Sequence, residues 1–200
     1  MPRVRYVAVL AAVLALAVAG VASAATAARV TGGTTKVTLS AAALSALTAN
    51  KITARVVKPA KVTGATVTFP ITGGRLNTKT LIGVIRHSGG IAFVKGKNAL
   101  ALLRPTISST KAGVSLSALV IKGHVRRCHK VHGKRVCKVI VTYTSVRVAN
   151  VTGVKLSNGK VTGTLKLTAA AAAALNKVAG KKVFAAGVVL GTAVVAPTLK

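Results

Sequence analysis

Short runs of alternating apolar and polar residues dominate the chain, and most of them are rich in Val, Thr and Ile. This alternation fits pleated strands with one buried face, which β-branched residues favour. Turns rich in Gly, Asn or Lys separate most runs, a spacing typical of antiparallel sheet. The predicted strands are Lys36–Leu39, Ala65–Phe69, Thr80–His87, Ile91–Val94, Ala99–Leu103, Val114–Val125, Lys138–Val148, Val151–Leu156, Val161–Leu167 and Val188–Val195. We therefore predict a mainly β, sandwich-like fold of antiparallel sheets.

Two Ala-rich segments interrupt this pattern and predict short helices, because Ala has the highest helix propensity. Ser40 precedes AAALSALTAN and Thr168 precedes AAAAAALNKVAG, and both residue types are good N-caps. Asn50 and Gly180 stand where a left-handed C-cap is expected. With these helices the fold class is α+β by strict count.

A strand–helix–strand pattern occurs twice, at residues 36–70 and 164–197. Leu39 to Leu47 matches Leu167 to Leu175, and Gly64 to Pro70 matches Gly191 to Pro197 with a one-residue gap. Two copies are too few for a solenoid, so we predict one pseudo-symmetric domain over residues 25–200. The alternative is a chance match that arises from the Ala and Val bias.

The first residues have the order of a secretory signal peptide. Arg3 and Arg5 precede an apolar run that ends at Ala22-Ser23-Ala24, a small-x-small cleavage site. The run is short for a bilayer span of about 20 residues. We predict a signal peptide over residues 1–24, with cleavage after Ala27 or an uncleaved anchor as alternatives. The mature chain is then secreted or associated with the cell envelope.

The charge balance narrows the possible functions. The chain has 30 Lys and Arg residues and no Asp or Glu, so without Arg3 and Arg5 the mature part keeps 30 − 2 = 28 basic side chains. The usual glycosidases, Ser-His-Asp hydrolases and calcium sites all need carboxylates. We therefore predict a binding or structural module and not an enzyme. Its expected partner is an anionic ligand, an anionic envelope polymer or a membrane surface.

Two cysteines flank a possible hairpin. With His132-Gly133 at the tip of a two-residue turn, Cys128 lies opposite Cys137, in the closest type of cross-strand pair. A pair of cysteines in an exported chain favours a disulfide. The alternative is a zinc site with the ligands Cys128, His129, His132 and Cys137, although His129 faces away from both cysteines in a flat hairpin.

The same hairpin is strongly basic, with Arg126, Arg127, Lys130, Lys134, Arg135 and Lys138. It is either a solvated loop or a patch for envelope polymer, lipid headgroups or nucleic acid. Nucleic acid is the least favoured of these, because aromatic residues that could stack on bases are scarce. A second hairpin is predicted at Asn158-Gly159, the preferred pair for a two-residue turn.

The centre of the chain holds a glycine-rich motif, Gly83-Val-Ile-Arg-His-Ser-Gly-Gly-Ile-Ala-Phe93, followed by Leu100-Ala-Leu102 and Pro105-Thr-Ile107. His87 ends a predicted strand beside glycines that admit close approach by a backbone or a ligand. This stretch resembles the HtaA-like haem-binding domain of actinobacterial envelope proteins. The family pattern is a Gly-x-apolar-x-x-His-x-Gly-x-apolar turn, then a strand and a Pro-x-apolar segment, and this chain has one residue fewer between Gly83 and His87.

The resemblance implies an exported, mainly β protein with an accessible haem pocket. In the family a Tyr near the first helix ligates the iron and a His assists it. His87 is the residue that carries over, whereas the segment Ser40–Asn50 contains no Tyr. Tyr143 lies in a late strand and does not match the ligand position. The candidate ligand-binding residues are His87, Arg86 and Tyr143, with haem as the candidate cofactor.

The charge balance generates a first prediction. Added salt or a polyanion should raise the melting temperature of the mature chain, because screening reduces the repulsion among its basic side chains. Calorimetry from low to moderate salt tests this, and a flat melting temperature would contradict it.

Overall fold

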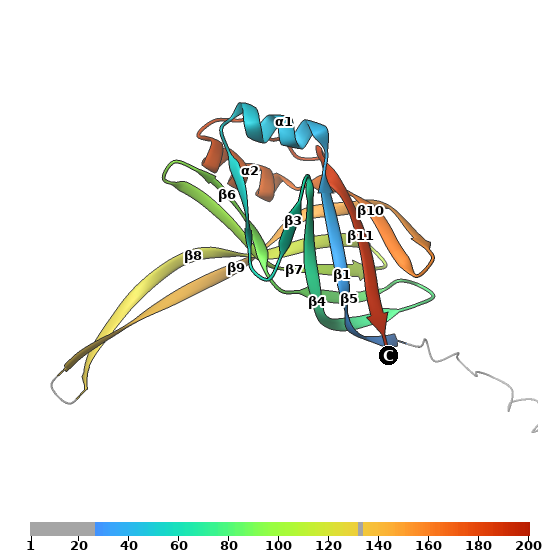
Figure 1. The fold of residues 1–200 in the computed structure, drawn as a ribbon, viewed down its shortest axis with the longest axis horizontal. Helices are drawn as coiled ribbons and strands as arrows, with labels where there is room; N and C mark the ends of the chain where they lie inside the picture. Colours follow the sequence, from blue (N-terminus) through green and yellow to red (C-terminus); the bar gives the residue numbers. More distant parts are fainter. Residues whose placement is uncertain (1–26, 132–133) are drawn as a thin grey trace, which may run out of the picture.

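Antiparallel strands make up most of the computed structural model, which describes residues 27–131 and 134–200 (Figure 1). The predicted signal peptide lies outside these residues. The elements are β1 (Ala27–Leu39), α1 (Ala41–Ala49), β2 (Thr53–Val57), β3 (Lys61–Thr63), β4 (Thr66–Asn77), β5 (Gly83–His87), β6 (Gly90–Lys95), β7 (Asn98–Thr110), β8 (Gly113–Val131), β9 (Lys134–Ser157), β10 (Lys160–Leu167), α2 (Ala169–Ala179) and β11 (Val189–Leu199). The mainly β prediction is confirmed.

One sheet contains all the strands and closes on itself. Its order is β2-β6-β7-β5-β4-β1-β11-β10-β9-β8, and β3 pairs with β4 off this path. An additional pairing of β8 with β7 completes a ring. The two walls that face each other across the core are therefore parts of one continuous sheet, where the sequence suggested separate sheets. β5 and β6 lie along the same edge of β7, since β6 pairs with Asn98–Leu103 and β5 pairs with residues 106–109.

The strands β2 and β3 were not predicted. Residues 53–55 and all of β3 are exposed and the rest of β2 is half-buried, so no buried alternation marks them. β9 is one strand where two were expected. The Asn158-Gly159 turn is confirmed: φ is 49° and 70° at these residues, and Ser157 pairs with Lys160.

Both helices begin as predicted. The hydroxyl of Ser40 accepts from the Ala43 amide, and that of Thr168 accepts from the Ala171 amide. Gly180 adopts the left-handed conformation with φ 75°. Asn50 does not, since its φ is −99° and its side chain donates to the Ala46 carbonyl. The left-handed residue comes one position later, at Lys51.

The same backbone contact occurs within each of the two strand–helix–strand segments. The Leu39 amide donates to the Ala65 carbonyl, and the Leu167 amide donates to the Val188 carbonyl. By this contact Ala65 corresponds to Val188, whereas the sequence match placed Gly64 against Gly191. The connections differ because the first contains β2 and β3 and the second contains no strand.

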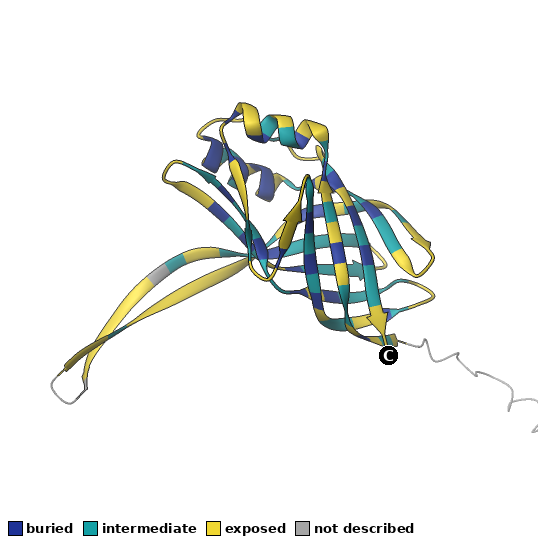
Figure 2. Ribbon diagram, viewed as in Figure 1, coloured by how far each residue is buried: buried dark blue, intermediate teal, exposed yellow. Residues whose placement is uncertain are grey.

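The helices lie together at one end of the ring, and α2 supplies much of the core (Figures 1 and 2). Its buried residues are Ala171, Ala172, Leu175, Val178 and Ala179, which cluster with Phe93, Leu100 and Leu102. Lys95 of β6 donates from Nζ to the Ala179 carbonyl at 2.6 Å. A cation is favourable there because the C-terminal end of a helix carries partial negative charge. Among the described residues, no helix is long and apolar enough to cross a bilayer.

Crowding between β1 and β11 generates a prediction. Gly33 and Gly113 both have positive φ, but only at Gly33 would a Cβ meet the neighbouring backbone, at the Ala196 carbonyl oxygen. Gly33→Ala should therefore lower the free energy of unfolding by about 1–3 kcal/mol more than Gly113→Ala. Urea denaturation measures both, and equal losses would show that the contact costs nothing.

Candidate functional site

His87 ends β5 and points into the ring. Side chains alternate along a strand, so Ile85 and His87 are buried and Arg86 between them is exposed. His87 is only 4% exposed. Two of the residues predicted as a joint ligand site, Arg86 and His87, therefore lie on opposite faces of the sheet.

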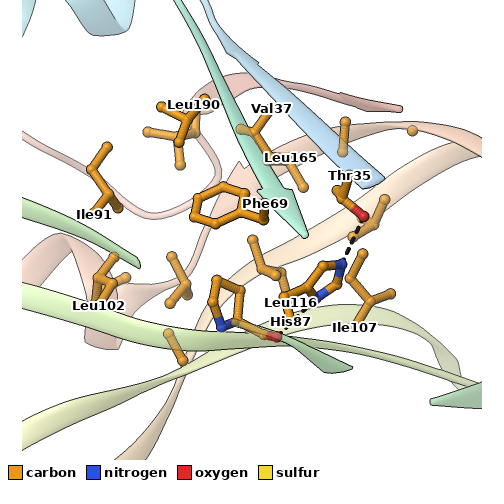
Figure 3. Close-up of a pocket in the computed structure, with 18 of the residues that line it drawn as sticks. Thr35, Val37, Phe69, His87, Ile91, Leu102, Ile107, Leu116, Leu165 and Leu190 are labelled. Atoms are coloured by element: carbon orange, nitrogen blue, oxygen red, sulfur yellow. Dashed lines mark hydrogen bonds between the residues drawn. The ribbon is translucent and has the colours of Figure 1, made fainter. Parts of the chain in front are cut away.

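Both ring nitrogens of His87 have partners. Nδ1 lies 2.8 Å from the Pro105 carbonyl, and Nε2 lies 2.7 Å from the Thr35 hydroxyl (Figure 3). A carbonyl oxygen only accepts, so Nδ1 carries the hydrogen and the hydroxyl donates to Nε2. Burial lowers the pKa of His87, and the bond to Pro105 offsets this in part. The imidazole is therefore neutral near pH 7, and it binds β5 to β1 and β7.

The space around His87 is small and apolar. Phe69 lies edge-on to the imidazole, with ring centroids 6.5 Å apart, and aliphatic side chains such as Leu116 and Leu165 line the rest (Figure 3). The cavity holds about 100 Å³. Ligand pockets are roughly 300–1,000 Å³, so this cavity is unfilled packing space inside the ring.

The glycines that follow His87 allow two backbone segments to meet. A Cβ on Gly89 (φ 78°) would lie 2.6 Å from the Ala60 nitrogen and 2.8 Å from the Val57 carbonyl oxygen. The close approach expected from the sequence is therefore made by the turn between β2 and β3. On the other side, the Arg104 amide donates to the Gly89 carbonyl at 2.8 Å.

Outside the ring, this junction borders an open groove of about 640 Å³. Its basic residues are Lys58, Arg86 and Arg104, and we call it the cationic groove. Its hydroxyl-bearing residues are Thr72, Ser88, Thr106, Ser117 and Ser145. The chain has no Asp or Glu that could neutralise these cations. The groove therefore offers charge and hydrogen-bond donors to an anion from outside.

Constrained backbone holds each of the three cations. Lys58 belongs to the turn that packs on Gly89, and Arg86 directly precedes His87. Arg104 has φ 47° at the irregularity where β7 changes partner from β6 to β5. The sequence does not distinguish Lys58 and Arg104, because basic residues occur throughout the chain. The Arg104-Pro105 pair was the available signal, since Pro cannot donate to a sheet ladder.

Tyr143 lies apart from both the cavity and the groove. It is 50% exposed on β9 and pairs with Ile121 of β8. The helix α1 contains no Tyr, and Nε2 of His87 is already engaged by Thr35. The groove lining includes His87, whose two nitrogens are both engaged, and no Tyr, Met or Cys. The residues around His87 therefore do not fit a haem whose iron is ligated by the protein.

The cysteine hairpin has the predicted register. Cys128 pairs with Cys137, and Val131 pairs with Lys134. The two cysteines form a disulfide. Both sulfurs are then used, so the alternative zinc site does not form in this oxidised chain. Of its two further ligands, His129 pairs with Val136 and His132 lies outside the described residues.

Three solved structures from Corynebacterium glutamicum share this fold. The C-terminal domain of HtaA aligns with a TM-score of 0.58 and 15% identity, over 86% of this chain and 99% of that domain. The heme-binding protein HtaB aligns with 0.54 and 17%, over 86% and 95%. The N-terminal domain of HtaA aligns with 0.55 and 14%, over 84% and 99%. At these identities the comparison shows a common fold.

No protein-family model and no curated protein matches the sequence. The resemblance inferred from the glycine-rich motif therefore agrees with the solved structures at the level of fold.

The buried imidazole generates a prediction about pH. Below the ordinary pKa of 6.5, His87 binds a proton in the unfolded chain but stays neutral in the folded chain, because burial lowers its pKa. The contribution of neutral His87 to stability is therefore complete above pH 6.5 and is lost as the pH falls. The free energy of unfolding should fall by up to about 1.4 kcal/mol per pH unit, and His87→Gln should flatten this slope.

Urea denaturation between about pH 5 and pH 8 measures the slope. His129→Gln, at an exposed position, is the matched control and should keep it. An unchanged slope in His87→Gln would show that another group is responsible.

Proposed function

We propose that this chain is an exported cell-envelope binding module with the HtaA fold, and that it binds an anionic ligand in the cationic groove. The observation that carries the proposal is the meeting of Lys58, Arg86 and Arg104 around one open groove. Export is inferred from the basic and apolar N-terminal sequence. We infer a binding role, and not catalysis, because both nitrogens of the buried histidine are engaged in structural bonds.

The groove suits phosphate or carboxylate groups. A guanidinium presents a planar set of donors that matches both groups, and charge-assisted bonds of this kind are about twice as strong as neutral ones. The surrounding hydroxyls, such as those of Ser88 and Thr106, are able to donate to further oxygens. Because the backbone beside each cation is constrained, less ordering remains to be done when a ligand binds.

Haem is the first ligand to test, because HtaB is a heme-binding protein of the same fold. Haem carries two propionate groups, which are carboxylates of the class the groove suits. The groove lining contains no Tyr, Met or Cys, and both nitrogens of its His87 are engaged. We therefore propose that any haem affinity here rests on the propionates. Iron-free protoporphyrin IX should then bind as well as haemin does.

The matching prediction uses the oxidised mature chain that begins at Ala25. Titration with protoporphyrin IX and haemin should give saturable spectral changes with similar dissociation constants. Arg86→Gln with Arg104→Gln should weaken both by about 10–100-fold or more, the equivalent of one or two lost charge-assisted hydrogen bonds.

Lys155→Gln with Lys160→Gln is the matched control, because it removes the same charge from exposed positions elsewhere. Equal weakening by both double variants, or non-saturable binding, would leave a general polycation as the explanation. Tighter binding of haemin than of protoporphyrin IX would instead point to an iron ligand that the groove lining does not contain.

A further inference from the structure

Beyond the ring, β8 and β9 continue as a projecting two-stranded ribbon (Figure 1). We call residues 121–131 and 134–143 the arm. The pairing of β8 with β7 ends at Val120, and β9 pairs with β10 only from Ala149 onward. Among the described residues, each strand of the arm therefore has the other as its one pairing partner.

Most of the arm is exposed (Figure 2), and its exposed residues include a concentration of apolar side chains. Those between 36% and 55% exposed are Ile121, Val125, Val136, Val139, Ile140, Val141 and Tyr143. A ribbon without a layer packed on it buries little apolar surface, and clustered exposure of this kind marks an interaction surface.

The apolar pairs occur on both faces of the arm. Ile121 pairs with Tyr143, and Val125 pairs with Ile140. Tyr143 and Ile140 are three residues apart on one strand, so they point to opposite faces. The apolar surface is therefore suited to a medium that surrounds the arm and less suited to one flat protein face.

The same ribbon is basic throughout. Its basic residues are Lys122, Arg126, Arg127, Lys130, Lys134, Arg135 and Lys138, and all of them are exposed. Like charges oppose each other at Arg127–Lys138 and Lys130–Arg135, on either side of the disulfide. Opposed like charges destabilise a strand pair, so the disulfide maintains a concentration of charge that the strands themselves disfavour.

The occupant of this surface must satisfy both properties. A second copy of the chain would bring equal positive charge. A soluble polyanion would bind the basic side chains and leave the apolar ones exposed. Lipid phosphates attract basic side chains, and the boundary between headgroups and acyl chains accepts aliphatic ones. We propose that the arm binds the surface of a bilayer that contains anionic lipids, with its basic side chains on the phosphates and its aliphatic side chains in that boundary.

The test is co-sedimentation of the oxidised mature chain, which begins at Ala25 and holds every described element, with phosphatidylcholine vesicles with or without phosphatidylglycerol. Binding should require phosphatidylglycerol. The triple variant Arg126→Gln, Lys130→Gln, Arg135→Gln should weaken it by roughly 100-fold, since each basic residue contributes about fivefold near an anionic surface. The matched control carries Lys36→Gln, Lys155→Gln and Lys160→Gln at exposed positions on the body, and it should keep most of the affinity.

A second variant separates a bilayer from a polymer. Val125→Thr with Ile140→Thr keeps both residues β-branched and all charges, so it should weaken vesicle binding several-fold and leave binding to soluble polyphosphate unchanged. The chain has no Trp, so Tyr143→Trp adds a single reporter whose emission should shift to the blue with phosphatidylglycerol vesicles. The proposal fails if the two triple variants bind alike, if the Thr variant keeps full vesicle affinity, or if the emission does not shift.

Discussion

The two hydrogen bonds of His87 fix the junction of three strands, β1, β5 and β7, around which the rest of the sheet is arranged. They connect β5 to Thr35 of β1 and to the Pro105 carbonyl of β7, where β7 exchanges β6 for β5 as its partner. On the outer side of the same junction, the Gly89 turn receives the segment that carries Lys58 and the amide of Arg104. One buried neutral residue thus anchors the junction beside the cationic groove, whose lining includes His87 itself.

The absence of acidic residues explains how the cations are distributed. Lys95 finds its partner in a backbone carbonyl at the end of α2, where the helix supplies partial negative charge. In the groove and along the arm, the basic side chains remain on open surface. A fold of this composition keeps its interior apolar and leaves the neutralisation of these surfaces to molecules outside the chain.

Local features could be predicted from the sequence, and long-range ones could not. The caps at Ser40 and Thr168, the Asn158-Gly159 turn and the register of Cys128 with Cys137 each depend on a few neighbouring residues. The closure of the sheet through β7 and β8 depends on contacts between distant segments and leaves no local pattern. Lys58 and Arg104 were missed because basic residues occur throughout the chain and only the fold brings these two together. The glycine-rich motif indicated the right fold, but its histidine proved to be engaged on both nitrogens.

The arm also bears on the order in which the protein acquires its structure. The disulfide closes a segment that adds no pairing to the ring, because the pairing of β8 with β7 ends at Val120, opposite Thr144 of β9, and β9 pairs with β10 only from Ala149. The sheet is therefore able to close while both thiols are still reduced. Oxidation is therefore separable from assembly of the core: it acts on the shape of an appendage.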